Sequence, residues 1–96
     1  MERNKARTII VREGEHLRLR CPVNGGFPQP NVEWMRVDGK TISIGAWEAT
    51  SMPGHTLNIT KVNRAHMGAY ICIADNGIAV PVNQTFQLDV YCEFRA

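Results

Sequence analysis

The stretch Gly68-Ala69-Tyr70-Ile71-Cys72-Ile73-Ala74 constrains the fold more than any other part of this chain. It has the pattern G-x-Y-x-C-x-A, and Cys21 and Trp34 precede it. A Cys…Trp…Cys order, with a tyrosine two residues before the second cysteine, is typical of a sandwich of two β-sheets. In such a sandwich the cysteines join the sheets, the tryptophan packs against the disulfide, and the tyrosine hydroxyl bonds to the backbone at a corner. We therefore predict a Cys21–Cys72 disulfide, a core Trp34 and a tyrosine corner at Tyr70.

Alternating segments elsewhere in the chain predict an all-β fold of seven or eight short strands, with no helix longer than a turn. Polar and apolar residues alternate in four segments, 16–21, 31–37, 56–60 and 84–90. The 96 residues suffice for one domain. We expect it to span 8–91, with linkers over 1–7 and 92–96. Because the polar start of the chain contains no apolar signal segment, we also expect a domain cut from a longer protein.

Two large apolar residues lie outside the alternating segments. Trp47 belongs to the stretch 45–54, which is expected to be irregular. Filling of the core is the preferred interpretation of Trp47, and an exposed anchor is the alternative. Met67, at the corner before the tyrosine, is expected to be covered as well.

The cysteines and two glycosylation sequons favour an extracellular protein. A Cys21–Cys72 bond would close a loop of about fifty residues and contribute roughly 4 kcal/mol in the chain-entropy model. Disulfides persist in oxidising compartments. The alternative is a pair of buried thiols in an intracellular sandwich. The triplets Asn58-Ile59-Thr60 and Asn83-Gln84-Thr85 both satisfy the N-glycosylation pattern N-x-[ST] of secreted proteins. Because secreted proteins fold in an oxidising compartment, the two triplets favour a disulfide over free thiols. The third cysteine, Cys92, is interpreted as a linker residue rather than a reactive thiol.

No pattern for catalysis or metal binding appears. The three histidines have no partner at metal-ligand spacing, and the sequence contains no phosphate-binding loop or nucleophile–base motif. We therefore expect no enzyme, no cofactor and no metal. The net charge of +2 does not call for a nucleic-acid partner. Arg18 and Arg20 are expected to face solvent beside Asn58. A heparin-like polyanion could bind there, but an ordinary solvated sheet face is the preferred interpretation.

Alternation also predicts an apolar patch on the outer face of one sheet. Residues of two strands should point outward side by side, namely Met35, Val37, Ile71 and Ile73. Monomers rarely expose large apolar patches, so these four residues are the candidate protein interface. The alternatives are that the patch is small or that the neighbouring strand 41–44 covers it. A glycan on Asn58 would shield the opposite sheet and would favour this face as the contact surface.

Several motifs together resemble an I-set immunoglobulin domain over nearly the whole chain. These motifs are V-x-E-G at 11–14, L-x-C at 19–21, G-x-P-x-P-x-V-x-W at 26–34, L-x-I at 57–59 and G-x-Y-x-C-x-A-x-N-G at 68–77. The stretch His66-Met67-Gly68-Ala69-Tyr70 further resembles the second immunoglobulin domain of lachesin-like neuronal receptors, which include the DPR-interacting and IgLON groups. General I-set domains have an aspartate, commonly paired with an arginine, where His66 stands, so that ion pair is not expected. After the last strand, 91–94 read Y-C-E-F where the family usually has a proline-rich linker.

The resemblance implies an immunoglobulin-like Greek-key β-sandwich of two antiparallel sheets. It also implies an extracellular, membrane-anchored adhesion or recognition receptor with tandem immunoglobulin domains. Partners would be other cell-surface immunoglobulin-superfamily proteins, bound homophilically or heterophilically, and neighbouring domains of the same chain. In that family the first domain provides the main binding face, so a second domain could instead space its neighbours. Two alternatives remain open. One is an accessory ectodomain of a receptor kinase or phosphatase, and the other is a structural module of an intracellular filament.

Overall fold

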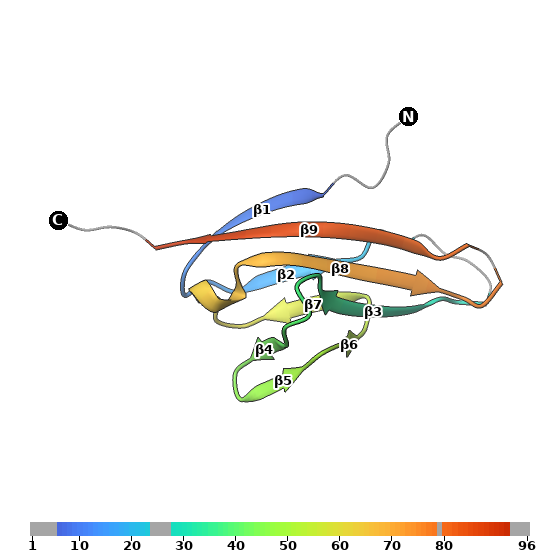
Figure 1. The fold of residues 1–96 in the computed structure, drawn as a ribbon, viewed down its shortest axis with the longest axis horizontal. Helices are drawn as coiled ribbons and strands as arrows, with labels where there is room; N and C mark the ends of the chain where they lie inside the picture. The colour runs from blue at the N-terminus through green and yellow to red at the C-terminus, as the bar shows by residue number, and fades with distance from the viewer. Residues whose placement is uncertain (1–5, 24–27, 79, 93–96) are drawn as a thin grey trace.

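The described part of the chain folds into strands and one turn of 3-10 helix, as Figure 1 shows. The computed structural model describes residues 6–23, 28–78 and 80–92. In chain order the elements are β1 (Arg7–Arg12), β2 (Leu17–Arg20), β3 (Asn31–Arg36), β4 (Ile42–Ile44), β5 (Trp47–Ala49), β6 (Met52–Pro53), β7 (Thr56–Ile59), η1 (Arg64–His66), β8 (Gly68–Asp75) and β9 (Val82–Tyr91). The predicted all-β architecture is confirmed. Of the expected linkers 1–7 and 92–96, residues 1–5 and 93–96 lie outside the described part, and Arg7 already belongs to β1.

Five strands form the larger sheet, in the order β1-β9-β8-β3-β6. Within the described residues, the facing strands pair as β2 with β7 and, separately, as β4 with β5. Figure 1 shows β9 and β8 running side by side along the length of the molecule, with β1 along the outer edge of β9. Every pair is antiparallel except β1 with β9, which is parallel. The structure therefore differs from two purely antiparallel sheets at the edge where β1 joins the last strand of the chain.

The core forms where the inward residues of the two layers meet. Alternation buries Leu17 and Leu19 on β2, and Leu57 and Ile59 on β7. The larger sheet contributes Val32, Trp34, Tyr70, Cys72, Ala74, Phe86, Leu88 and Val90. These are the inward positions that the alternating patterns predict. Their burial removes apolar surface from water, which is the main favourable term in folding.

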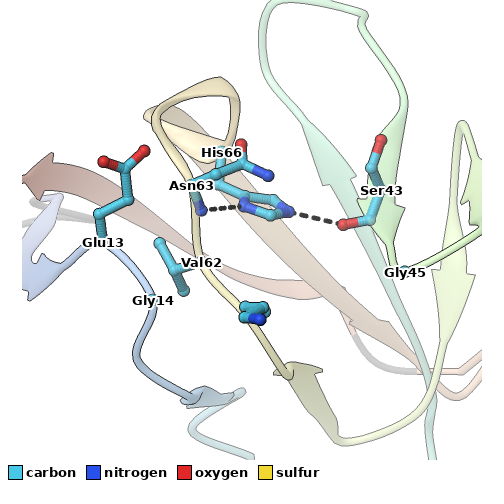
Figure 2. Close-up of a pocket in the computed structure, with 8 residues that line it drawn as sticks. Glu13, Gly14, Ser43, Gly45, Val62, Asn63 and His66 are labelled. Atoms are coloured by element: carbon cyan, nitrogen blue, oxygen red, sulfur yellow. Dashed lines mark hydrogen bonds between the residues drawn. The ribbon is translucent and has the colours of Figure 1, made fainter.

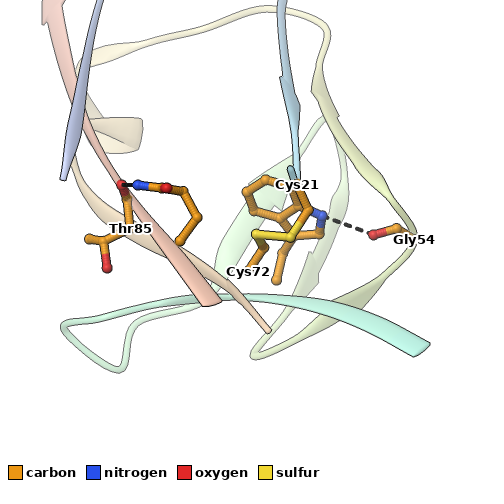
Figure 3. The surroundings of a disulfide bond; sticks show 6 residues. Cys21, Gly54, Cys72 and Thr85 are labelled. Atoms are coloured by element: carbon orange, nitrogen blue, oxygen red, sulfur yellow. Dashed lines mark hydrogen bonds between the residues drawn. A yellow bond between two sulfur atoms is a disulfide. The ribbon is translucent and has the colours of Figure 1, made fainter. Parts of the chain in front are cut away.

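The Cys21–Cys72 disulfide links the two layers at the centre of this core, with its Cα atoms 5.9 Å apart. Trp34 lies directly opposite Cys72 in the β3–β8 register. The Trp34 indole Nε1–H donates to the Gly54 carbonyl at 3.0 Å, so the buried polar atom is satisfied (Figure 3). The Trp34 ring also lies 5.5 Å, centroid to centroid, from the Phe86 ring. The predicted disulfide and core tryptophan are therefore both present.

Two expectations about apolar residues are wrong. Trp47 is 68% exposed on β5, and Met67 is 42% exposed before β8. The stretch 45–54 is not irregular, since it contains β5 and β6. Ile42 and Trp47 lie on the same face of the β4–β5 hairpin, since Ile42 is opposite Ala49 and Ile44 is opposite Trp47. Ile42 is fully buried in the core, whereas Trp47, beside the turn that joins the two strands, is exposed. Among the described residues, no helix has the length and apolar character to cross a membrane.

Candidate interaction surface

The outer face of the larger sheet brings the four residues of the predicted interface together. Met35 on β3 lies directly opposite Ile71 on β8, and Ile73 is the next outward residue of β8. Val37 extends this face just beyond β3, where its N–H donates to the Ala69 carbonyl at 2.9 Å. Val37 is 59% exposed, and the other three residues are partly buried. We call these four residues the apolar patch.

Strand β4 does not cover the apolar patch, although the sequence left that alternative open. Ile42 is buried in the core and Ile44 packs against the core. Strand β4 forms hydrogen bonds with β5 rather than with β3. The strand paired with β3 at that edge is the two-residue β6, where Pro53 lies opposite Glu33. The face of the patch therefore remains open to solvent among the described residues.

The patch continues into polar residues of β9. Asn83 lies opposite Ile73, and Thr85 lies opposite Ile71. Sequence reasoning treated Asn83 only as a second sequon and did not connect it with this face. Alternation shows that Asn83 and Thr85 share a face, but only the register of β8 with β9 places them beside the two isoleucines.

The opposite layer has the polar surface that the sequence predicts. Arg18 pairs in register with Asn58, and the Arg18 Nε–H donates to the Asn58 Oδ1 at 3.0 Å. Both residues and Arg20 are exposed. The two sequons are therefore on different layers of the sandwich, with Asn58 beside arginines and Asn83 beside isoleucines.

Arg36 forms the main polar cluster in the core, and sequence reasoning overlooked it. It is the inward residue after Trp34 and is only 8% exposed. Its guanidinium binds the Asp38 carboxylate in a bidentate manner, with Nε–Oδ1 3.2 Å and Nη2–Oδ2 3.0 Å. It also donates to the carbonyls of Ala65, at 2.8 Å, and Met67, at 2.7 Å. A charged residue at an inward position of an alternating strand was the signal that could have identified it.

Tyr70 completes this cluster as the predicted tyrosine corner. Its hydroxyl donates to the His66 carbonyl at 2.6 Å, and the Arg36 guanidinium lies 5.1 Å from the centre of its ring. Burial raises the pKa of the Tyr70 hydroxyl. The pKa of the Asp38 carboxyl is lowered mainly by the hydrogen bond from the Lys40 backbone N–H, and secondly by the hydrogen bond from the Arg36 side chain. Arg36 is thus held by the Asp38 carboxylate and by two backbone carbonyls.

His66 itself lies beside a small pocket at one end of the sandwich, shown in Figure 2. Its Nδ1 accepts the Asn63 backbone N–H at 2.9 Å, and its Nε2 lies 2.6 Å from the Ser43 carbonyl. The Asn63 side chain accepts the Ala65 backbone N–H, which completes a capping box on η1. Both ring nitrogens therefore have structural partners, and the histidine ties η1 to β4.

No cluster of metal-ligating side chains appears in the part of the chain that the structure describes. Within residues 6–23, 28–78 and 80–92, no group of three metal-ligating side chains is present. Cys92 is exposed and follows β9, and it has no disulfide partner among these residues. The apolar patch on one sheet face and the polar surface on the other are features that suit recognition.

Comparison with known proteins identifies similar domains over most of the chain. Residues 3–76 match a family model described as an immunoglobulin domain. The chain is 36% identical over 90 residues to the human MAM domain-containing glycosylphosphatidylinositol anchor protein 2, covering 94% of this chain and 9% of that protein. It is 30% identical over 87 residues to lachesin of Schistocerca americana, covering 91% of this chain and 24% of lachesin.

A solved structure of similar fold is that of Dpr11 IG1 bound to DIP-gamma IG+IG2. It matches with a TM-score of 0.82 and 37% identity, covering 92% of this chain and 44% of that one. The matches to lachesin and to this complex confirm the resemblance to lachesin-like proteins that the sequence indicated. The chain spans less than half the length of each of these proteins.

Proposed function

The chain belongs to the immunoglobulin domain family, and from this premise we propose that it is a recognition domain of a multi-domain cell-surface adhesion receptor. In this proposal the domain contacts another immunoglobulin-superfamily protein through the outer face of its larger sheet. It performs no catalysis and needs no cofactor. The resemblance to lachesin-like proteins supports a neuronal receptor.

The observation on which this proposal rests is the apolar patch. Met35 and Ile71 are cross-strand neighbours, and Ile73 and Val37 extend the apolar surface along both strands. Apolar residues on the outer face of a sheet lie outside the fold's own core, and extended patches of such residues mark interaction sites. The solved complex of Dpr11 with DIP-gamma is an assembly of two immunoglobulin proteins, which supports a partner of the same class.

Three features support an extracellular location. The Cys21–Cys72 disulfide is suited to an oxidising compartment. The two sequon asparagines both lie on outward-facing positions of their strands. The name of one relative includes a glycosylphosphatidylinositol anchor, which supports attachment of the whole protein to a membrane. These features also argue against the filament module, which would contain reduced thiols.

The proposal can be tested by placing a charge in the patch. The chain and its Ile71→Lys variant are each immobilised and screened against a panel of immunoglobulin-superfamily ectodomains and against the chain itself, by surface plasmon resonance. Both are produced without glycans, so that the face is bare. Because Ile71 is at the centre of the patch, we expect the substitution to weaken binding by about 30-fold, as for an interface hot spot.

A matched control is available on the opposite layer. Thr56 is an exposed strand residue of β7, and Thr56→Lys adds the same charge there. This control should leave the affinity unchanged. Equal loss of binding in the two variants, or no loss in Ile71→Lys, would refute docking through this face.

A further inference from the structure

The sequon at Asn83 lies on the same sheet face as the apolar patch. We propose that Asn83 is an N-glycosylation site whose glycan covers the patch, so that only chains without this glycan dock a partner through the face. The effect of the glycan on docking rests on the function proposed above. The attachment of the glycan to Asn83 does not depend on that function.

The register of β8 with β9 provides the first argument. Asn83 is directly opposite Ile73, and the sequon's Thr85 is directly opposite Ile71. Side chains opposite each other in an antiparallel pair have Cβ atoms about 5 Å apart. A glycan on Asn83 would therefore begin beside one isoleucine of the patch and lie within reach of the other.

The position of Asn83 in its strand provides the second argument. Asn83 is the second residue of β9, which begins at Val82. Its side chain is partly exposed on the outward face of the strand. The sequon therefore lies near the end of the sheet, and a glycan there would not displace any part of the core.

The composition of the face provides the third argument. An apolar patch open to solvent is a liability in a monomer, and an N-linked glycan is a bulky, solubilising group. Asn58 cannot serve this purpose, because it lies on the opposite layer, opposite Arg18. Of the two sequons, only the one on β9 can shield Ile71 and Ile73.

The covalent step needs a lipid-linked oligosaccharide diphosphate as co-reactant. The side-chain amide nitrogen of Asn83 forms an N-glycosidic bond to the anomeric carbon of the sugar. The bond from that carbon to the lipid diphosphate breaks, and the amide proton is released with the diphosphate. No oxidation or reduction takes place.

The test compares two variants that each remove one sequon. Thr85→Val abolishes the Asn83 sequon and keeps a β-branched residue in β9. Thr60→Val abolishes the Asn58 sequon at the residue that follows β7. Both variants and the unaltered chain are secreted from animal cells, and site occupancy is measured by peptide mass spectrometry. Hydroxyl-radical footprinting then reports the exposure of Met35 in the patch, with buried Met52 as an internal reference.

We expect glycan on Asn83 in the unaltered chain and a rise of about twofold or more in Met35 oxidation in Thr85→Val, since a bulky surface group is lost. Thr60→Val should leave Met35 oxidation unchanged. If Thr85→Val fails to fold, enzymatic deglycosylation of the folded Thr60→Val variant removes the same glycan and should produce the same rise. An unoccupied Asn83, or an occupied Asn83 with unchanged Met35 oxidation, would overturn the inference.

The outcomes also separate this inference from the proposed function. A glycan that protects Met35 supports the inference even when no ectodomain binds the bare patch, and in that case only the docking proposal fails. Conversely, an unoccupied Asn83 overturns the inference while Ile71→Lys still tests docking.

Discussion

Replacing Arg36 with methionine should destabilise the domain strongly, because this arginine connects three parts of the chain. Its guanidinium joins β3 to the carbonyls of Ala65 and Met67 and to the Asp38 carboxylate. Methionine keeps an unbranched apolar stem of similar length but removes every one of these donors. The substitution therefore tests the hydrogen bonds separately from the packing.

The magnitude follows from the two carbonyl contacts. A hydrogen bond from a charged donor contributes about 1.5–3 kcal/mol to stability. Loss of the two bonds, at 2.8 and 2.7 Å, should lower the free energy of unfolding by about 3 kcal/mol at the lower limit of that range. For a domain of this size, 1 kcal/mol corresponds to about 4–8 °C, so the melting temperature should fall by roughly 12–24 °C.

Urea unfolding with the disulfide intact is the appropriate assay. A Trp47→Phe background leaves buried Trp34 as the fluorescent probe, and circular dichroism checks that both probes report one transition. Asp38→Asn is the control, because the Asp38 side chain is 39% exposed whereas that of Arg36 is only 6% exposed. We expect this control to have a much smaller effect, since exposed ion pairs contribute little.

The reasoning fails if Asp38→Asn destabilises the domain as much as Arg36→Met. The ion pair, rather than the carbonyl contacts, would then be the main contribution of Arg36. A fall of less than about 1 kcal/mol in Arg36→Met, below the value of one charged hydrogen bond, would show that water replaces the guanidinium at both carbonyls.

Three further predictions follow from the same region and from the disulfide. The Cys21–Cys72 bond joins residues 51 apart. Replacing both cysteines with alanine should lower the free energy of unfolding, measured in urea, by about 4 kcal/mol. An unchanged urea midpoint would count against a disulfide in the native protein. Gly68→Ala should cost about 1–3 kcal/mol, because Gly68 has φ +141° and an added Cβ would lie 2.6 Å from the Arg36 Nη2; a neutral effect would mean that the guanidinium moves freely. The pKa of the Asp38 carboxyl is lower in the folded protein than in the unfolded chain, so the ionised carboxylate stabilises the fold at a pH above the unfolded pKa. The free energy of unfolding should therefore fall as the pH drops below about 4. Acid unfolding curves of Asp38→Asn should show a weaker decline.

The inward positions of this fold could be predicted from sequence because alternation is a local property. A residue's parity within its strand decides which face it occupies, so Leu17, Leu57 and Ile71 lie on the faces expected of them. Arg36 also follows parity, but its charge concealed its burial. Its compensation comes from carbonyls about thirty residues away along the chain, and no local pattern indicates such partners.

Trp47 is the converse case, a large apolar residue that the structure leaves exposed. Its size suggested burial, yet Ile42, on the same face of the β4–β5 hairpin, is the residue that reaches the core. How far along a short hairpin the core extends depends on how the hairpin docks against the opposite layer. That choice is made by packing between segments and is not encoded in the hairpin's own pattern.

The sequence by itself determined the sandwich, the disulfide, the tyrosine corner and the outward direction of the four patch residues, because each depends on spacing within one strand or on a motif of fixed geometry. Only the tertiary structure decided that β1 runs parallel to β9, that Arg36 is held by Asp38 and two carbonyls, and that Asn83 lies beside Ile73. These features depend on the register between strands that are distant in the chain. A shift of one residue in that register would move Asn83 away from the patch without changing any local pattern.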